Sequence, residues 1–396
     1  MWSKMLSEKR IVLGVSGGIA AYKSVEISRR LVDAGAFVSP IMTSSAKKFI
    51  GEVTLSALAS EPVKSSLWDD DDPIPHTTLG QQADLILVAP ATAKLIGTYA
   101  AGISSDLLSA TLLATRAPVI LCPAMHTEMW EHPAVQENIN TLKSRGVVIV
   151  DPEDGILAGG DLGKGRLAGV EAILSEVEST LTKKDLSNLR LLITAGGTRE
   201  PIDPVRYITN KSSGKQGYAL AKAAHLRGAE VTLVTTMPDD VPFGVEVLCA
   251  ETASDMRNVV MGIQSEYDVI IMAAAIADFR PAEISEQKIK KRKGSTNLKL
   301  ENTHDFLIDL GKGKRPEQTI VGFAAETEHL EENALEKLER KHLDLIVANN
   351  VSHPGVGFSY DTNEVTIMSQ DSKWTLPLSD KRIIADGILD ALLEVR

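Results

Sequence analysis

Cysteine is scarce in this chain, which has only Cys122 and Cys249 among its 396 residues. Two thiols cannot form a disulfide framework or a cysteine-based zinc site, and they suit a reducing compartment. No apolar run reaches the roughly 18 residues of a membrane-spanning helix, and the N-terminus has no apolar signal core. The net charge of −11 argues against general nucleic-acid binding. We therefore expect a cytoplasmic protein that acts on small molecules, with no membrane or nucleic-acid partner.

Apolar strands alternate with helical segments along the whole chain. The length of 396 residues suggests two domains of roughly 150–200 residues each, and the polar segment 179–188 is the expected boundary. Continuous apolar strands separated by helices are typical of a doubly wound, mostly parallel sheet. We therefore predict two α/β domains, residues 1–183 and residues 189–396. The strands are expected at 11–15, 37–42, 85–89, 119–122, 191–194, 231–234, 269–273, 320–323 and 345–348.

Hydroxyl and small side chains follow the first two predicted strands. Ser16 and Gly17 come directly after the first strand, and Thr43 and Ser44 follow the second. Ligands of an open parallel sheet bind at the carboxyl ends of its strands. A nicotinamide dinucleotide would require an acidic residue after the second strand for its ribose hydroxyls, whereas hydroxyl side chains suit a phosphate. The first half therefore favours flavin mononucleotide (FMN).

A long polar loop connects strand 191–194 to a helix that begins near Tyr218. Gly214 and Gly217 lie at the start of this helix, where they let the backbone come close to a ligand. The cations of the loop are Arg199, Arg206, Lys211 and Lys215. Because a helix N-terminus presents backbone N–H groups, such a loop suits an anion. Neither G-x-G-x-x-G nor G-x-x-x-x-G-K-[ST] is present, and an ordinary surface loop is the alternative.

Small residues also end the third strand of the second half, where Ala273, Ala274 and Ala275 precede Asp278. Small side chains let a flat base or a sugar lie against the backbone. Asp278 would accept hydrogen bonds from a ribose or help to hold Mg²⁺, and a turn acid is the alternative. Farther along, residues 288–293 contain five cations in six positions. We interpret this run as a lid over a triphosphate, with a solvated loop or a nucleic-acid tag as alternatives.

Three motifs of the second half resemble signatures of one enzyme family. Residues 210–214 (NKSSG), residues 323–327 (FAAET) and the run that begins at Lys288 (KIKK) resemble the NxSSG, FAAET and K-x-K-K motifs of phosphopantothenate–cysteine ligases. Loops of the first half resemble those of flavin-containing cysteine decarboxylases. The chain thus resembles, over nearly its whole length, the bifunctional phosphopantothenoylcysteine decarboxylase/phosphopantothenate–cysteine ligases of coenzyme A synthesis. This resemblance implies a flavodoxin-like decarboxylase domain followed by a Rossmann-like ligase domain.

For the second half, the resemblance implies that 4′-phosphopantothenate is joined to cysteine with CTP and Mg²⁺ through an acyl-cytidylate. Asn210 would hydrogen-bond this intermediate, Arg206 would orient it and Lys288 would assist its formation. The nucleotide contacts that the family implies are Ala273, Ala274, Ala275, Asp278, Lys288, His304, Asp305, Phe306, Leu307, Phe323, Lys337 and Lys341. Spacing alone does not distinguish CTP from ATP, and the two lysines at i, i+4 spacing would otherwise serve helix solubility.

For the first half, the resemblance implies FMN-dependent decarboxylation of phosphopantothenoylcysteine to 4′-phosphopantetheine, with His76 as the base near the thiol. The FMN contacts that it implies are Ser16, Gly17, Ile19, Thr43, Ser44, Pro90, Ala91, Thr92 and Ser105. Decarboxylases of the family assemble through trimers and the ligases as dimers, so we expect a homo-oligomer.

Two positions depart from the family pattern. In P-x-M-N-x-x-M-W, the Asn grips the substrate carboxylate, and His126 takes its place here. In A-C-G-D, the Cys donates a proton during reduction of the enethiol, and Gly159 takes its place. His126 stays a catalytic candidate because imidazole can bind a carboxylate, whereas the nearby Cys122 is expected to be buried packing. The alternative function is a ligase whose degenerate flavin domain serves as an oligomerisation scaffold or regulatory binder. A nicotinamide-linked oxidoreductase is disfavoured because neither half has the fingerprint.

Overall fold

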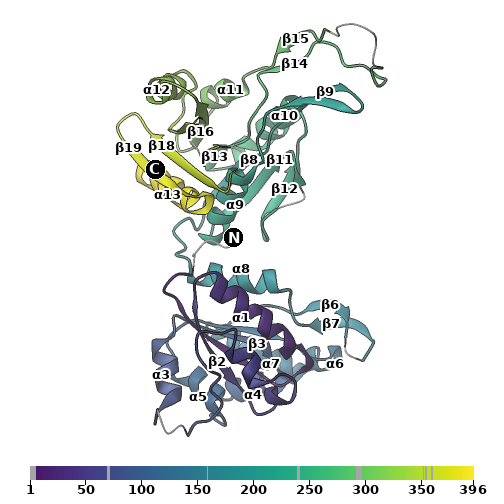
Figure 1. The fold of residues 1–396 in the computed structure, drawn as a ribbon, viewed down its shortest axis with the longest axis vertical. Helices are drawn as coiled ribbons and strands as arrows, with labels where there is room; N and C mark the ends of the chain where they lie inside the picture. The colour runs from purple at the N-terminus through teal and green to yellow at the C-terminus, as the bar shows by residue number, and fades with distance from the viewer. Residues whose placement is uncertain are drawn as a thin grey trace. The chain divides into compact units, whose positions relative to one another are not determined.

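The computed structural model divides the chain into two compact units, Met1–Thr182 and Lys183–Arg396 (Figure 1). Each unit has its own sheet, and the core strands of both sheets are parallel, which confirms the predicted fold class. The structure describes residues 6–68, 72–157, 159–238, 241–290, 297–350, 352, 355–357 and 360–396. The end of the predicted cationic lid, residues 291–293, lies outside the described residues.

The first unit is built on a five-stranded parallel sheet. Its strands are β1 (Arg10–Val15), β2 (Phe37–Met42), β3 (Leu85–Ala91), β4 (Val119–Pro123) and β5 (Val148–Ile149), in the spatial order β2-β1-β3-β4-β5. Its helices are η1 (Ile19–Tyr22), α1 (Lys23–Asp33), η2 (Ala46–Lys48), α2 (Glu52–Ser56), α3 (Pro75–Gln82), α4 (Ala93–Ala100), α5 (Leu107–Ala114), α6 (Thr127–Trp130), α7 (Pro133–Ser144) and α8 (Val170–Leu181). An antiparallel hairpin of β6 (Glu153–Ile156) and β7 (Leu162–Arg166) pairs separately from this sheet.

The strands of the first unit are apolar throughout because both faces of the sheet are covered. Every residue of β3 is buried, as expected for the central strand of a parallel sheet with helices on both sides. Alternate side chains enter two different cores, with Leu85 and Leu87 on one face and Ile86 and Val88 on the other. The chain order reverses between β1 and β3, so the loops after these strands separate at the carboxyl edge and leave room for a ligand.

The second unit is built on an eight-stranded mixed sheet. Its strands are β8 (Arg190–Ala195), β11 (Glu230–Thr235), β12 (Glu246–Cys249), β13 (Val269–Met272), β16 (Thr319–Glu326), β17 (Leu345–Asn350), β18 (Thr362–Met368) and β19 (Lys373–Asp380). The spatial order is β12-β11-β8-β13-β16-β17-β18-β19, and only the pairs that involve β18 are antiparallel. Smaller antiparallel pairs are formed by β9 (Arg199–Asp203) with β10 (Arg206–Thr209), and by β14 (Phe279–Pro281) with β15 (Leu300–Asn302).

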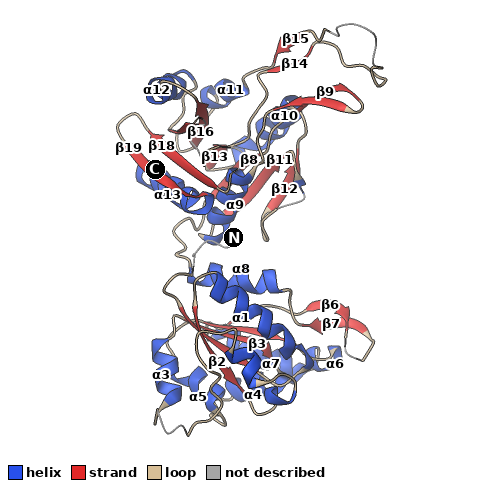
Figure 2. Cartoon of the chain, viewed as in Figure 1, coloured by secondary structure: helices blue, strands red, loops and turns tan. Residues whose placement is uncertain are grey.

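Helices cover both faces of this second sheet (Figure 2). One face packs on α9 (Lys215–Leu226) and α13 (Lys381–Val395), and the other packs on α10 (Ala253–Ile263), α11 (Phe306–Lys312) and α12 (Leu330–Arg340). A short helix, η4 (Gln264–Glu266), leads from α10 into β13. The chain order reverses between β8 and β13, which places the loops after these two strands at the ligand-binding edge.

Candidate functional site

A cavity of about 700 Å³ lies at the carboxyl ends of β1 to β4 in the first unit. This volume falls within the roughly 300–1,000 Å³ typical of small-molecule sites. Its walls come from the loops after these four strands, from the starts of α4 and α5, and from the β6–β7 hairpin. The cavity is therefore at the position that the topology predicts for a ligand.

Ser16 fastens two walls of this cavity together. Its hydroxyl donates to the carbonyl oxygen of Pro90 at 2.8 Å and accepts from the backbone N–H of Thr92 at 2.9 Å. Gly17 follows, and a Cβ atom at this position would lie 2.2 Å from the Cβ atom of Ser45. Only glycine therefore allows the loops after β1 and β2 to approach this closely, which leaves backbone N–H groups and hydroxyls at the cavity wall.

Most of the residues predicted to contact FMN lie in the cavity wall. They are Ser16, Gly17, Ile19, Thr43, Ser44, Thr92 and Ser105. Pro90 and Ala91 are buried in β3 and are not part of the wall, although the Pro90 carbonyl holds Ser16. Lys23 and Arg166 also line the cavity and were not predicted. Asp106, next to the predicted Ser105, lines the cavity as expected and forms a capping box with Ser109 at the start of α5.

The composition of this wall suits a flavin mononucleotide. The hydroxyls of Thr43, Ser44 and Ser45 gather after β2 beside the glycine loop, where a phosphate would find donors. Apolar and aromatic groups, including Ile19 and Met125, supply surfaces for a flat ring. The residues present thus provide both the polar and the apolar parts of a flavin site.

His126 projects from the loop after β4 and lines the cavity, whereas His76 does not. His76 lies in the first turn of α3, and its Nδ1 atom is buried without a hydrogen-bond partner. Cys122 is fully buried in β4, which confirms that it packs in the core, and this burial raises the pKa of its thiol strongly. Of these three residues, only His126 lies in the cavity wall formed by a single chain.

In the second unit, Asn210 joins the loop after β8 to the loop after β13. Its side-chain nitrogen donates to the carbonyl oxygens of Ala275 at 3.2 Å and Ile276 at 3.1 Å. The backbone N–H of Ala275 in turn donates to Gly196 at 2.8 Å. The structure thus brings the predicted Asn210 and the small residues 273–275 together where the strand order reverses.

Arg206 is held by a buried carboxylate. Its guanidinium donates to Asp203 through Nε at 3.0 Å and through Nη2, and Nη2 also donates to the carbonyl oxygen of Ile289 at 2.8 Å. Asp203 accepts from the Ile289 N–H as well, at 3.1 Å. Hydrogen bonds from Arg206 hold the pKa of Asp203 well below its usual range. Asp203, which was not predicted, therefore anchors the segment that carries the exposed Lys288.

The predicted lysines of the nucleotide site are paired with carboxylates. Lys337 donates to Glu326 at 2.5 Å, and the Nζ atom of Lys341 lies 2.8 Å from Asp305. These two pairs come from α12 or its end and from segments at the carboxyl edge of the sheet. The predicted lysines therefore face this edge, and they do not simply extend into solvent.

Other predicted nucleotide contacts differ in what their side chains can offer. His304 and Asp278 are exposed, and the imidazole of His304 lies 2.6 Å from a carboxylate oxygen of Asp309. Phe306 is buried in the core, so its side chain is not free to contact a ligand. Leu307 and Phe323 are partly buried and pack against the two cores of the unit.

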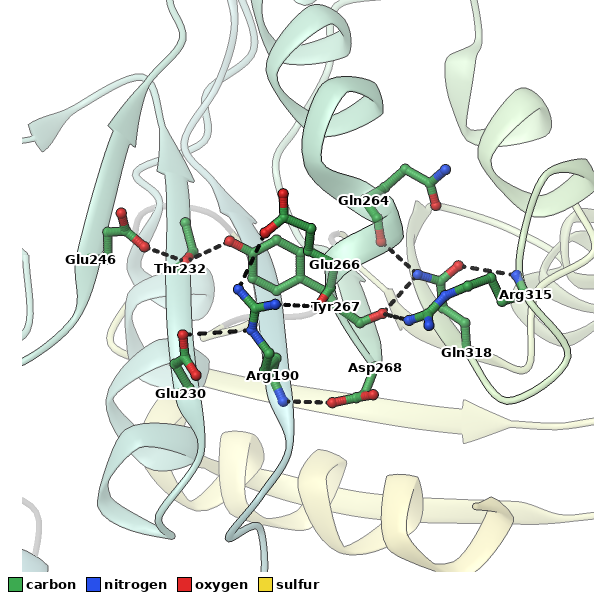
Figure 3. Close-up of polar contacts among 10 residues, drawn as sticks. All are labelled: Arg190, Glu230, Thr232, Glu246, Gln264, Glu266, Tyr267, Asp268, Arg315 and Gln318. Atoms are coloured by element: carbon green, nitrogen blue, oxygen red, sulfur yellow. Dashed lines mark hydrogen bonds and ion pairs between the residues drawn. The ribbon is translucent and has the colours of Figure 1, made fainter.

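The opposite, amino edge of the same sheet carries a polar network that was not predicted (Figure 3). The hydroxyl of Tyr267 donates to Thr232 at 2.8 Å, and the Thr232 hydroxyl donates to Glu246 at 2.8 Å. The guanidinium of Arg190 lies 5.1 Å from the centre of the Tyr267 ring. Asp268 accepts from the backbone N–H of Arg190 at 2.9 Å. These groups join neighbouring strands at their starts.

Asp268 precedes a strand and accepts an N–H from the adjacent strand, as Asp84 and Asp344 also do. Asp84 accepts from Arg10 at 2.8 Å, and Asp344 accepts from Ile320 at 2.8 Å. An acid directly before an apolar run was a visible signal in the sequence for these roles. Among the residues that the structure describes, no group of three or more His, Cys, Asp or Glu side chains is arranged to hold a metal ion. The described helices include none that is long and apolar enough to cross a membrane.

Family models match both units of the chain. Residues 2–182 match the model described as "Flavoprotein", and residues 186–395 match "DNA/pantothenate metabolism flavoprotein C-terminal domain". The chain is therefore a two-domain flavoprotein of the pantothenate-metabolism class.

Curated relatives of the whole chain carry a more specific name. The "Coenzyme A biosynthesis bifunctional protein CoaBC" of Mycobacterium tuberculosis is 44% identical over 403 residues, covering 97% of this chain and 96% of the relative. The protein of the same name from Bacillus subtilis is 45% identical over 396 residues, covering 98% of this chain and 97% of the relative. The chain belongs to the CoaBC family.

Solved structures align with the separate units. The C-terminal domain of a CoaBC protein is 40% identical, covers 53% of this chain and 96% of that chain, and has a TM-score of 0.45. A mutant PPC decarboxylase complexed with pantothenoylaminoethenethiol is 29% identical, covers 43% of this chain and 96% of that chain, and has a TM-score of 0.40.

Proposed function

We propose that residues 189–396 join 4′-phosphopantothenate to cysteine with CTP, and that residues 1–183 decarboxylate the product with FMN. The chain is a bifunctional ligase and decarboxylase of coenzyme A biosynthesis, as its family membership establishes. The finer assignments are the substrates, the nucleotide and the residues. They are supported above all by one observation: each unit brings several of the predicted residues together where its strand order reverses.

In the ligase step, the substrate carboxylate attacks the α-phosphorus of CTP, and pyrophosphate leaves. The cysteine amine then attacks the acyl-cytidylate, the amide forms and CMP leaves. Lys288, Lys337 and Lys341 would neutralise the polyphosphate, with Mg²⁺ arriving as its counter-ion. Because Lys337 and Lys341 are paired with carboxylates, polyphosphate binding would exchange one anionic partner for another.

Asn210 would hold the acyl-cytidylate, and Arg206 would orient it through the Lys288 segment. The side-chain nitrogen of Asn210 is already bonded to the backbone of residues 275 and 276. This fixes the loop and leaves the amide oxygen in one orientation. Arg206 is held by Asp203 and donates a hydrogen bond to the carbonyl oxygen of Ile289. We therefore assign both residues to positioning the intermediate.

In the decarboxylase step, the residues of the cavity wall would hold FMN, which would supply reversible hydride transfer at the thiol-bearing carbon of the substrate. The carboxylate would then leave beside a carbon–sulfur double bond, which accepts the electron pair. The loops at Gly17 and Thr43 would hold the phosphate, and Ser105 would line the ring site. His76 lies outside the wall of the cavity, so its assignment as base requires a second copy of the chain to bring it there. We accordingly propose a homo-oligomer, acting in the cytoplasm.

The assignment of Asn210 is tested by supplying the purified chain with 4′-phosphopantothenate, cysteine, CTP and Mg²⁺ and measuring products by mass spectrometry. In Asn210→Asp, a carboxylate would face the carbonyl oxygens of Ala275 and Ile276 and would repel the acyl-phosphate. Ligation should fall by about 10²–10³-fold, as when one transition-state donor is lost. Decarboxylation of supplied phosphopantothenoylcysteine should not change.

Asn258→Asp supplies the matched control, because Asn258 is an exposed residue of α10. It should retain normal ligation. Normal ligation by Asn210→Asp would exclude the proposed role. Formation of the amide without carbon dioxide by the unaltered chain would instead favour the degenerate flavin domain.

A further inference from the structure

His126 and Gly159 share one place in the flavin cavity. His126 lines the cavity, and Gly159 lies in the turn between β6 and β7. A Cβ atom at residue 159 would lie 3.1 Å from Cε1 of His126 and 3.0 Å from a carboxylate oxygen of Asp161. The imidazole therefore lies against the space of a side chain at residue 159, and it would have to move by a few tenths of an ångström to admit a Cβ atom there.

The hairpin is held against the His126 loop by its backbone. The N–H of Met125 donates to the carbonyl oxygen of Gly165 at 3.0 Å. A Cβ atom at Gly163 would lie 2.3 Å from the hydroxyl oxygen of Thr127. These two contacts involve Met125 and Thr127, the neighbours of His126 in the chain. They fix the hairpin against the loop, and this places residue 159 next to the imidazole.

The reaction requires a proton at this place. Loss of carbon dioxide leaves an enethiolate, whose carbon next to the amide nitrogen must gain a proton before the hydride returns to the carbon that bears sulfur. Among the described side chains of the cavity wall, histidine is the type that exchanges a proton near neutral pH. Lys23 donates to the carbonyl oxygen of Leu167 at 3.2 Å, and Cys122 is buried away from the wall.

We propose that protonated His126 first binds the substrate carboxylate and then donates its proton to the carbon that bore this carboxylate. This proposal rests on the proposed decarboxylase function. A group that binds the carboxylate lies next to that carbon when carbon dioxide leaves. The imidazolium N–H bond breaks, a C–H bond forms, the C=C bond becomes single and the C–S bond becomes double. The neutral imidazole regains its proton from solvent. One residue thus performs binding and protonation, and a side chain at 159 is not required.

The first test uses the FMN-loaded full chain with phosphopantothenoylcysteine. His126→Asn keeps a side chain that can hydrogen-bond the carboxylate but removes the proton donor. Carbon dioxide should still form, while 4′-phosphopantetheine formation falls about 100-fold or more, the usual contribution of a general acid. The accumulated product should be the enethiol, which lacks two hydrogens, and the flavin absorbance should show the reduced state. Normal 4′-phosphopantetheine formation and flavin reoxidation by His126→Asn would overturn the proposal.

The second test asks whether the two positions compete for space. Gly159→Cys alone should lower turnover because its Cβ atom would displace the imidazole. Combined with His126→Asn, the same change should raise 4′-phosphopantetheine formation above that of His126→Asn alone, since a thiol can then enter the vacated space and donate a proton. If Gly159→Cys has the same effect with and without His126→Asn, side chains at positions 126 and 159 do not compete for the same space.

Cys122→Ala is the rival-donor variant. It should form 4′-phosphopantetheine and reoxidise the flavin, and enethiol accumulation in this variant would assign the proton to Cys122 and overturn the proposal. Flavin absorbance and thermal unfolding of every variant report whether the unit is folded and loaded. Failure of the underlying function looks different, because the unaltered chain would then release no carbon dioxide.

Discussion

The two edges of the second sheet differ in how their polar groups are used. At the carboxyl edge, Asn210 bridges two loops. Lys337 and Lys341 form ion pairs with carboxylates there, and a polyphosphate could replace these carboxylates. The hydroxyl of Thr236 is buried there without a hydrogen-bond partner. At the amino edge, the groups of the Tyr267 network bond one another (Figure 3). Arg190 Nε and Gln264 Oε1 are also buried without a hydrogen-bond partner at the amino edge, although Arg190 Nε lies 3.5 Å from a carboxylate oxygen of Glu230. The two edges therefore differ in what their bonded groups join: loops and lysine–carboxylate pairs at the carboxyl edge, and the starts of neighbouring strands at the amino edge.

This difference has a direct energetic meaning. A buried polar group without a partner destabilises the folded chain, typically by about 1–3 kcal/mol, and beside a binding site a ligand can supply the missing partner. Bonds to a charged acceptor at the amino edge contribute to folding instead, about 1.5–3 kcal/mol each. Similar substitutions should accordingly affect stability at one edge and substrate binding at the other.

The largest effect is expected at Asp268. Asp268→Ala removes the carboxylate that accepts the Arg190 N–H, so the unfolding free energy of the second unit should fall by about 2 kcal/mol. Hydrogen exchange of the amides of β8, measured in the full chain, reports this loss locally. Ligase turnover should remain within about twofold, because the network lies at the edge away from the site.

Asp268→Asn is the matched control, since its amide oxygen can still accept from Arg190. Its loss of stability should be smaller than that of the alanine variant. A loss of ligase turnover in Asp268→Ala, with the unit still folded, would contradict the division between the two edges.

The sheet itself was accessible to sequence reasoning. Runs such as 269–273 and 345–348 are apolar without interruption, and only a strand covered on both faces has that pattern. The antiparallel pair β18 and β19 was not predicted, because neither strand is apolar throughout. At the margin of the sheet, β18 alternates between partly buried and buried residues, and β19 has only partly buried and exposed ones.

The candidate site was predictable where backbone spacing determines it, and less so where distant side chains meet. Gly17 and Asn210 belong to short motifs, and the structure places both where a ligand would bind. The role of Asp203 in anchoring the Lys288 segment gave no such signal, because Ile289, whose N–H it accepts, lies 86 positions away in the chain. Likewise, the approach of Gly159 to His126 depends on how a hairpin packs, which residue types alone do not specify.

A smaller effect, on binding instead of stability, is expected at Thr236. A Cβ atom at Gly196 would lie 2.2 Å from the Thr236 hydroxyl, so this buried oxygen faces the loop of the ligase site. Thr236→Val preserves the shape and removes the hydroxyl. We expect the KM for 4′-phosphopantothenate to rise about tenfold, equivalent to about 1.4 kcal/mol for one bond to a charged group. Stability should stay the same or increase slightly.

Thr232→Val gives the corresponding change at the amino edge, where the hydroxyl has two partners. It should lower stability and leave the KM unchanged. If both valine variants lower stability equally and neither changes the KM, Thr236 is an ordinary core residue and the contrast between the edges does not extend to it.

The smallest effect concerns pH and the ion pair of Asp185 with Arg227. The guanidinium contacts the carboxylate at 2.8 Å and 3.0 Å, and its hydrogen bonds lower the pKa of Asp185 from the ordinary value of 3.8. A lowered carboxyl pKa means that the ionised form favours folding above pH 3.8 and that this contribution is lost as the pH falls through the folded-state pKa. Asp185→Asn should therefore be about 1 kcal/mol less stable than the unaltered chain at pH 7, with the difference closing in acid. Urea unfolding of both proteins between pH 7 and acid measures this stability difference. A difference that persists unchanged at the lowest pH would assign the effect to packing.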